Sequence, residues 1–266
     1  MQKKLVKKRA KKSLGQNFLV DENILKKIVE INIINSETEI IEIGPGTGNL
    51  TDYLIKKNPK KIFAIEKDKE LSKNLLNKYF GKAEIINEDI LKFFNYKIFN
   101  KNTIIIGNLP YNISSQILVK FIKNKKWPPG YSDLIFMFQK ELAQKIFGKF
   151  PSKNYGRLSI LTNYRLNIID KFPVSPNCFF PKPKVSSLVL HFKPKKKLMF
   201  EIKDIQNLEK ITNILFSNKR KMVNKNLKKL FSLEKLKNVS FLNKKFRPGE
   251  IKPETYYKIT EQFEKK

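Results

Sequence analysis

The sequence predicts an α/β protein, with a mostly parallel sheet wrapped by helices, followed by a small all-helical C-terminal domain. Two observations support this fold class. Short apolar runs alternate with helix-like segments as far as about residue 192, as in repeated β–α units. After a lysine-rich linker at 194–197, apolar residues recur at helical spacing from Ile205 onwards. Because 266 residues suffice for one sizeable domain and a small second one, we assign 1–195 to the first and 200–266 to the second.

The first predicted β–α unit contains a glycine-rich turn. The strand-like run 40–43 leads into 44–48, of sequence Gly-Pro-Gly-Thr-Gly, and 49–55 is helix-like. Such a turn lets a ligand approach the backbone closely, and a helix start offers free N–H groups to an anionic or polar group. A dinucleotide fingerprint would have glycine where this chain has Asn49, so a pyrophosphate-bearing cofactor is less well supported.

Acidic residues follow the next two predicted strands. Glu66 comes directly after the run 61–65 and lies 66 − 46 = 20 residues after Gly46. At this spacing an acidic side chain accepts hydrogen bonds from ribose hydroxyls in nucleotide-binding α/β folds. Asp89 follows a third run at 83–87. Either acid alone could be an ordinary loop or capping residue, but ligands of open α/β sheets bind at the carboxyl ends of the strands.

The fourth predicted strand, 104–106, is followed by Asn108-Leu109-Pro110-Tyr111. Methylation of a planar adenine amine requires two acceptors that draw its nitrogen toward a tetrahedral shape. The Asn108 side chain can supply one, and the Leu109 carbonyl, constrained by Pro110, can supply the other. Tyr111 could stack on the base. The tetrapeptide alone favours an ordinary turn, but four polar strand ends in this order favour a single binding crevice.

The chain also resembles a known family, the S-adenosylmethionine-dependent rRNA adenine dimethyltransferases, over nearly its whole length. The matching segments are 13–19, 42–46, 107–114, 139–141, 155–159, 179–187 and 247–251. Within that family, these motifs are most similar to those of enzymes that act on small-subunit (16S) rRNA. The resemblance implies a Rossmann-like class I methyltransferase domain and S-adenosylmethionine as cofactor.

The resemblance further implies the cofactor-binding residues. These are Asn17, Leu19, Gly44, Gly46, Glu66, Asp89 and Asn108. Among them Glu66 would contact the ribose and Asp89 the adenine of the cofactor. Asn17 and Leu19 follow from the resemblance alone, because no spacing argument indicates them.

The implied catalytic residues are Asn108, Leu109, Pro110, Tyr111 and Phe179. The target adenine would be flipped out of its surroundings and would lie between Tyr111 and Phe179. Phe179 precedes another phenylalanine and could instead belong to the core. Transfer would be a direct in-line displacement from the cofactor, which needs neither a covalent enzyme intermediate nor a metal.

Composition is consistent with this chemistry. The chain has one histidine, His191, and one cysteine, Cys178, which together cannot form a His/Cys metal cluster. His191 lies within an apolar run, so we predict a strand residue rather than a catalyst. The single cysteine also excludes an intramolecular disulfide.

A net charge of +31 predicts binding to a polyanion such as RNA. Only five of the 55 basic residues are arginine, which indicates a genome rich in A and T, so the total means less than where the charges cluster. One cluster is a basic arm within 1–12, consisting of Lys7, Lys8, Arg9, Lys11 and Lys12. The other is Lys219, Arg220 and Lys221. The second cluster could instead be a solvated surface, and lysine at 219 lacks the bidentate fork of arginine.

The expected partner is small-subunit rRNA within an immature ribosomal particle, bound by a monomer. No apolar stretch approaches the roughly 20 residues of a membrane span, and no signal-peptide core follows the basic arm, so we expect a soluble cytoplasmic protein. Two alternatives stay open: a large-subunit (23S) rRNA dimethyltransferase that confers antibiotic resistance, and a mainly non-enzymatic ribosome assembly factor. The full-length match, Leu109 and the element at 247–251 favour the small-subunit enzyme.

Overall fold

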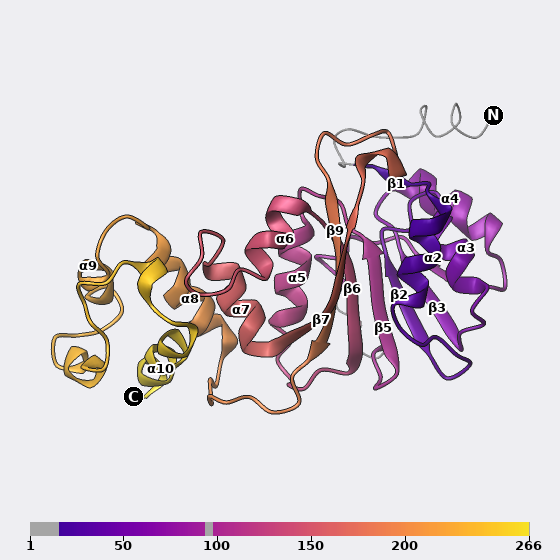
Figure 1. Ribbon diagram of the computed structural model, residues 1–266. Helices are drawn as coiled ribbons and strands as arrows, with labels where there is room; N and C mark the ends of the chain where they lie inside the picture. The colour runs from indigo at the N-terminus through magenta and orange to yellow at the C-terminus, as the bar shows by residue number, and fades with distance from the viewer. Residues whose placement is uncertain (1–15, 94–97, 266) are drawn as a thin grey trace. The chain divides into compact units, whose positions relative to one another are not determined.

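The computed structural model describes residues 16–93 and 98–265 (Figure 1). Its contacts divide the chain into two compact units. The first consists of Met1–Lys120, Pro129–Ala143 and Ile168–Pro194, and the second of Phe121–Pro128, Gln144–Asn167 and Lys195–Lys266. The C-terminal domain expected at 200–266 lies wholly within the second unit. That unit is larger than expected because it also takes in helix α7 (Arg157–Arg165), which packs against α8 and α10.

A seven-stranded sheet forms the centre of the first unit, in the order β4-β3-β2-β5-β6-β9-β7. The strands are β2 (Glu39–Ile43), β3 (Lys61–Ile65), β4 (Glu84–Ile86), β5 (Thr103–Asn108), β6 (Tyr131–Gln139), β7 (Leu166–Val174) and β9 (Ser187–Pro194). Strands β2 to β6 run parallel, and β9 is antiparallel to β6. The predicted α/β class with a mostly parallel sheet is confirmed. The strand order reverses between the adjacent strands β2 and β5, which is the topological switch point where such sheets bind ligands.

The helices of the first unit lie between its strands along the chain, and a capping aspartate precedes two of them. They are α2 (Glu22–Glu30), α3 (Asn49–Ile55), α4 (Lys69–Lys78), α5 (Ser114–Ile122) and α6 (Lys140–Ile146), the last two of which run on into segments of the second unit. The Asp21 side chain accepts a hydrogen bond from the Ile24 N–H at the start of α2, and Asp68 accepts from Glu70 and Leu71 at the start of α4. Helix α3 coincides with the segment predicted to be helical.

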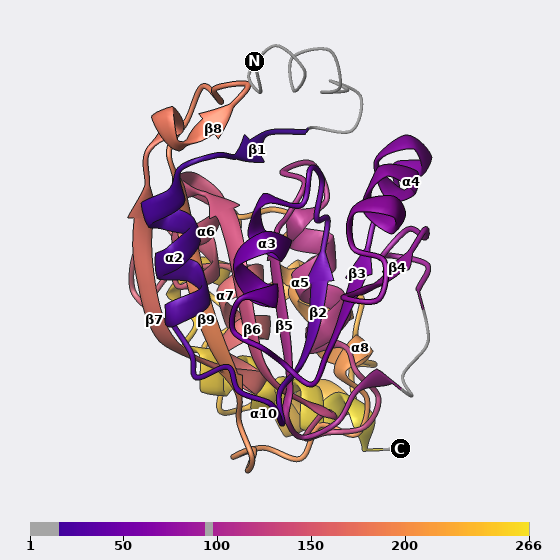
Figure 2. The ribbon, with the colours of Figure 1, turned by 90° about the vertical axis from the view of Figure 1, so that its right-hand side faces the viewer.

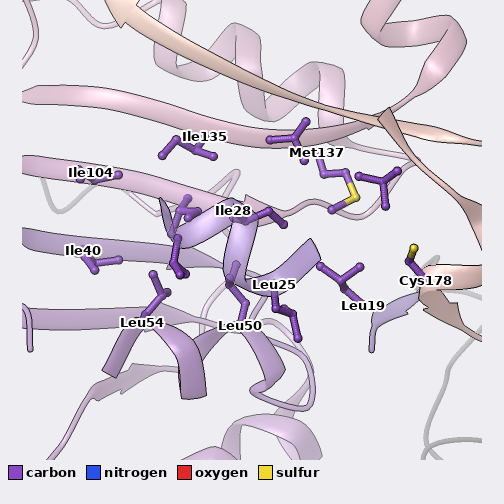
Figure 3. Close-up of a cluster of buried hydrophobic side chains, with 14 of the residues drawn as sticks. Leu19, Leu25, Ile28, Ile40, Leu50, Leu54, Ile104, Ile135, Met137 and Cys178 are labelled. Carbon is purple, nitrogen blue, oxygen red and sulfur yellow. The ribbon is translucent and has the colours of Figure 1, made fainter. Parts of the chain in front are cut away.

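Helices α2 and α3 cover one face of the sheet (Figure 2). Figure 3 shows Leu25 and Ile28 of α2, with Leu50 and Leu54 of α3, over side chains of β2, β5 and β6. The strand residues alternate along each strand, as the period of two requires, and include Ile40, Ile104, Ile135 and Met137. Burying each such side chain stabilises the fold by about 1.5–3 kcal/mol, so this layer fixes β2 and β5 side by side.

Two short strands form a second sheet in the first unit. Strand β1 (Phe18–Leu19) is antiparallel to β8 (Phe179–Phe180), with Phe18 opposite Phe180 and Leu19 opposite Phe179. The Val20 N–H extends this pairing by donating to the Cys178 carbonyl at 2.8 Å. Two sequence motifs that are 160 residues apart therefore lie side by side.

In the second unit, all regular structure between 200 and 265 is helical. This part of the chain contains α8 (Ile205–Phe216), α9 (Asn224–Leu227), α10 (Pro253–Glu264) and 3-10 turns at Lys235–Val239 and Pro248–Glu250. The second unit also contains α7. Tyrosine hydroxyls join these elements, since Tyr257 donates to the Ile160 carbonyl at 3.0 Å. Within the described residues of both units, no helix is long and apolar enough to cross a membrane.

Candidate active site

The polar residues predicted at the ends of four strands all line one pocket in the first unit. Its lining includes the glycine turn after β2, Glu66 after β3, Asp89 after β4, and 108–111 at the end of β5. Residues 16–19 line it as well, so the two positions that only the resemblance had indicated, Asn17 and Leu19, also belong to it. The pocket lies at the carboxyl ends of parallel strands, at the switch point of the sheet.

The glycine turn requires glycine for two separate reasons. Gly44 and Gly46 have φ angles of +68° and +61°, which L side chains rarely adopt. A Cβ at position 46 would also lie 2.8 Å from the Phe18 ring. The Gly46 N–H donates to Glu66 Oε2 at 3.0 Å, so the turn after β2 is joined to the residue that follows β3.

Glu66 is a buried carboxylate with two backbone donors. Besides the bond from Gly46, its Oε1 accepts from the Asp68 N–H at 2.8 Å. Burial raises the pKa of Glu66, and the N–H groups of Asp68 and Gly46 oppose that effect. A carboxylate oxygen has lone pairs for more than one hydrogen bond, so both oxygens of Glu66 can also accept from a ligand hydroxyl. Carboxylate oxygens that accept hydrogen bonds fit the ribose hydroxyls of S-adenosylmethionine, which donate them.

Asp89 lines the pocket, and each of its carboxylate oxygens accepts a hydrogen bond. Its Oδ1 accepts from the Leu91 N–H at 2.9 Å, and its Oδ2 accepts from Lys67 Nζ at 2.8 Å. The hydrogen bond from Lys67 is the main reason why the pKa of Asp89 is lowered. Lys120 Nζ steadies the chain just beyond, by donating to the carbonyls of Leu91 (3.0 Å) and Phe93 (2.6 Å). An ionised Asp89 is suited to accept a hydrogen bond from an adenine amine.

The tetrapeptide at the end of β5 has a fixed amide. Asn108 Nδ2 donates to the Asn17 carbonyl at 2.9 Å. The other polar atom of this amide, the side-chain oxygen, can accept a hydrogen bond from a ligand. The Tyr111 hydroxyl is hydrogen-bonded to Ser187 Oγ at 2.8 Å, and burial raises the pKa of Tyr111. Leu109 and Pro110 complete this wall of the pocket. The role of the Asn108 oxygen as an acceptor for the target amine stays a prediction.

Phe179 lies in the hydrophobic core, which is the alternative that the sequence left open for it. Its side chain is 3% exposed and belongs to the hydrophobic cluster that includes Leu19 and Cys178. It is not among the residues that line the pocket. The physical reason is the β1–β8 pairing, which turns Phe179 toward the layer under α2 and leaves Phe180 partly exposed. A stacking role for Phe179 on the target base stays a prediction.

Sequence reasoning missed two residues that shape the pocket. Lys67 pairs with Asp89, and Glu42 of β2 lies beneath the turn with 1% of its surface exposed. The Thr51 hydroxyl donates to Glu42 Oε2 at 2.6 Å, and burial raises the pKa of Glu42 to about 8. The signal for Glu42 is present in the sequence, because it is an acid within an otherwise apolar run.

The remaining predicted residues lie elsewhere. The basic arm with Lys7, Lys8, Arg9, Lys11 and Lys12 falls outside the described residues. Lys219, Arg220 and Lys221 are exposed in the second unit, in the turn that follows α8. His191 is a buried residue of β9, as predicted, and its Nε2 lies 2.6 Å from Asp133 Oδ1.

Comparison with known proteins identifies the family. The family model for the ribosomal RNA adenine dimethylase matches residues 7–265. The chain belongs to this family. It is therefore an S-adenosylmethionine-dependent rRNA adenine dimethyltransferase, and the predicted enzyme class and cofactor are confirmed.

Its relatives include two small-subunit enzymes. The chain is 44% identical over 257 residues to a protein of Pelagibacter ubique named ribosomal RNA small subunit methyltransferase A, covering 96% of this chain and 97% of that one. A protein of the same name from Malacoplasma penetrans is 40% identical over 262 residues, covering 96% of this chain and 92% of the relative.

Solved structures agree on the fold of this dimethyltransferase. A dimethyladenosine transferase from Plasmodium falciparum superimposes with a TM-score of 0.74 at 27% identity, over 93% of this chain and 98% of that one. The 23S rRNA methyltransferase ErmE gives a TM-score of 0.67 at 21% identity, over 93% and 100% of the two chains. At that identity, the second likeness shows the Rossmann-like fold alone. The large-subunit alternative is not favoured, because the two relatives above carry small-subunit names.

Proposed function

We propose that this dimethyltransferase modifies small-subunit (16S) rRNA, adding two methyl groups to the N6 amine of each of two adjacent adenosines near the 3′ end. The observation on which the proposal depends is the Asn108 amide, fixed by the Asn17 carbonyl in the pocket that also contains Glu66 and Asp89. The names of the two similar relatives support the choice of subunit.

In this proposal the first three strand ends hold the cofactor. S-adenosylmethionine supplies a methyl group that its sulfonium has already activated. Glu66 accepts hydrogen bonds from the ribose hydroxyls, and Asp89 accepts from the adenine amine. Gly44 and Gly46 leave room for the cofactor to approach the backbone, and Asn17 and Leu19 line the same pocket.

The fourth strand end presents the target base. The Asn108 side-chain oxygen and the Leu109 carbonyl accept the two hydrogens of the adenine amine, which directs the nitrogen lone pair toward the methyl group. Pro110 keeps the Leu109 carbonyl in place, and Tyr111 stacks on the flipped base. After transfer the extra proton on the amine leaves to water. A second methylation requires fresh cofactor and a singly methylated amine in the same pocket.

The rest of the proposal concerns how RNA is held. The lysine-rich arm and the Lys219, Arg220 and Lys221 cluster would neutralise phosphates without reading sequence. The substrate would be an immature small-subunit particle in the cytoplasm, bound by one copy of the chain. Binding of this kind would also allow a role in particle assembly alongside methylation.

A labelling experiment tests the choice of substrate. The protein is incubated with labelled S-adenosylmethionine and with each unmodified ribosomal subunit separately, and the modified bases are mapped by mass spectrometry. We expect label only in the small subunit, as N6-dimethylated adenosines at two adjacent positions. Label confined to the large subunit would contradict the proposal.

A further inference from the structure

Residues 17–19 line the pocket, and two asparagine side chains donate hydrogen bonds to their carbonyls. Asn108 Nδ2 donates to the Asn17 carbonyl at 2.9 Å, and Asn49 Nδ2 donates to the Leu19 carbonyl at 2.7 Å. One donor comes from the end of β5 and the other from the first residue of α3. The 17–19 segment therefore connects the side chain proposed to polarise the target amine with the element that follows the glycine turn.

Asn49 does not serve as an ordinary helix cap. The capping position of α3 is Gly48, which has no side chain, and the Asn49 amide reaches a carbonyl that is 30 residues upstream. Leu19 is 4% exposed, so its carbonyl belongs to a segment with little access to water. A buried carbonyl that loses its donor is left with an unmet hydrogen bond, which favours a shift of the short segment that carries it.

A second contact links the 17–19 segment to the turn. The Phe18 ring lies so close to Gly46 that a Cβ there would be 2.8 Å from it. On its other side, the segment pairs with Phe179 and Phe180 of β8. A shift of Leu19 would therefore be transmitted to the Asn17 carbonyl, and from there to the Asn108 amide.

We propose that Asn49 is a positioning residue for methyl transfer. By donating to the Leu19 carbonyl it fixes the 17–19 segment, so that the Asn17 carbonyl holds the Asn108 amide with its oxygen toward the target amine. The inference rests on the proposed role of Asn108. Glycine at position 49, as in a dinucleotide-binding turn, would lack this donor, so the departure from that pattern has a function of its own here.

Two substitutions at position 49 test the role of the donor. Asn49→Asp keeps the shape of the side chain and removes the donor. Asn49→Ser is well tolerated at helix starts, but its hydroxyl is too short to replace the amide. Asn74→Asp is the matched control, because Asn74 is exposed on α4 and does not line the pocket. The full-length variants are compared by kcat on ribosomal subunits, by cofactor binding in calorimetry, by thermal midpoint, and by hydrogen exchange.

For both position-49 variants we expect kcat to fall at least about tenfold, the change in rate that corresponds to about 1.4 kcal/mol. Amide exchange at Val20, which donates to Cys178, should accelerate to a similar extent, while β2 and β5 stay protected. The dissociation constant for S-adenosylmethionine should rise, because 16–19 line the pocket. The Asn74→Asp control should match the wild type in every measurement.

Three results would overturn the inference. The first is a kcat within twofold of wild type, and the second is a lower kcat with unchanged exchange at Val20. The third is faster exchange throughout the sheet with a lower thermal midpoint in both variants, which would make Asn49 a stabilising residue only. Exchange and cofactor binding need no RNA, so they report on Asn49 even if the labelling experiment assigns a different subunit.

Discussion

Glu66 is a buried residue whose proposed role, accepting hydrogen bonds from the ribose hydroxyls of the cofactor, requires a negative charge. Its two carboxylate oxygens accept backbone hydrogen bonds from Gly46 and Asp68, which hold the group rigidly at the end of β3. Burial raises the pKa of Glu66 above the ordinary value of 4.5. Only the ionised form offers every oxygen lone pair to ribose hydroxyls, so cofactor binding should depend on the charge of this residue.

The affinity for S-adenosylmethionine should therefore decrease as the pH falls through the raised pKa of Glu66. Because that pKa is higher in the folded protein, the loss should begin at a higher pH than for an exposed glutamate. Glu66→Gln cannot ionise and loses acceptor capacity, so we expect about a tenfold weaker affinity and a flatter pH profile. Calorimetry between about pH 5 and pH 8 measures both. Parallel profiles for the two proteins would rule out Glu66 as the titrating group.

For single residues of the site, the sequence predicts the position of those that lie at a fixed spacing from a motif in the same chain segment. Glu66 is such a residue, since it follows a strand at a fixed distance from the glycine turn. Lys67 and Phe179 are not, because their surroundings depend on pairings across the fold. Lys67, just after β3, contacts Asp89, which follows the neighbouring strand β4, and Phe179 pairs with Leu19. No local pattern encodes such contacts.

Among the elements, the adjacent strands β2 and β5 determine where the site forms. Gly107 of β5 lies against the end of β2, and a Cβ there would be 2.5 Å from the Ile43 carbonyl oxygen. This close approach brings the turn after β2 next to Asn108. The strands themselves were predictable from their apolar runs, whereas the requirement for glycine at 107 arises only once the two are packed together.

Gly107→Ala should push the two strands apart. We expect a decrease of about 1–3 kcal/mol in the free energy of unfolding, as for other overpacked sites, together with weaker cofactor binding. Gly249→Ala is the control, because a Cβ at 249 meets no atom within 4 Å. Denaturant unfolding of both variants provides the measurement. Equal stability of the two would show that β2 and β5 tolerate a wider spacing.

For the whole molecule, the net charge of +31 favours association with RNA, but most of it lies on dispersed lysines. The pocket belongs to the first compact unit, and the cluster of Lys219, Arg220 and Lys221 belongs to the second. Charges that contact phosphates should govern RNA affinity without altering cofactor binding. The sequence revealed these clusters but not their contacts, because exposed charges leave no packing signal.

Replacing Lys219, Arg220 and Lys221 by alanine should weaken RNA binding and reduce its dependence on salt. Each lost phosphate contact lowers the slope of log affinity against log salt by about 0.7–0.9. The dissociation constant for S-adenosylmethionine should not change. Titrations of rRNA at several salt concentrations measure the slope, and an unchanged slope would mean that the cluster is a solvated surface.

We propose that the Asn108 amide, at the switch point of the sheet, polarises the target amine. Asn108→Ala should lower the rate of methyl transfer by about 100-fold or more, as when one polar group of a catalytic pocket is removed. RNA affinity should stay within about twofold of wild type, because the phosphate contacts are untouched. Asn74→Ala, on the exposed face of α4, is the control. Single-turnover methylation of the small subunit by Asn108→Ala measures this role directly. We expect almost no transfer, and a wild-type rate would show that the Asn108 amide does not polarise the target amine.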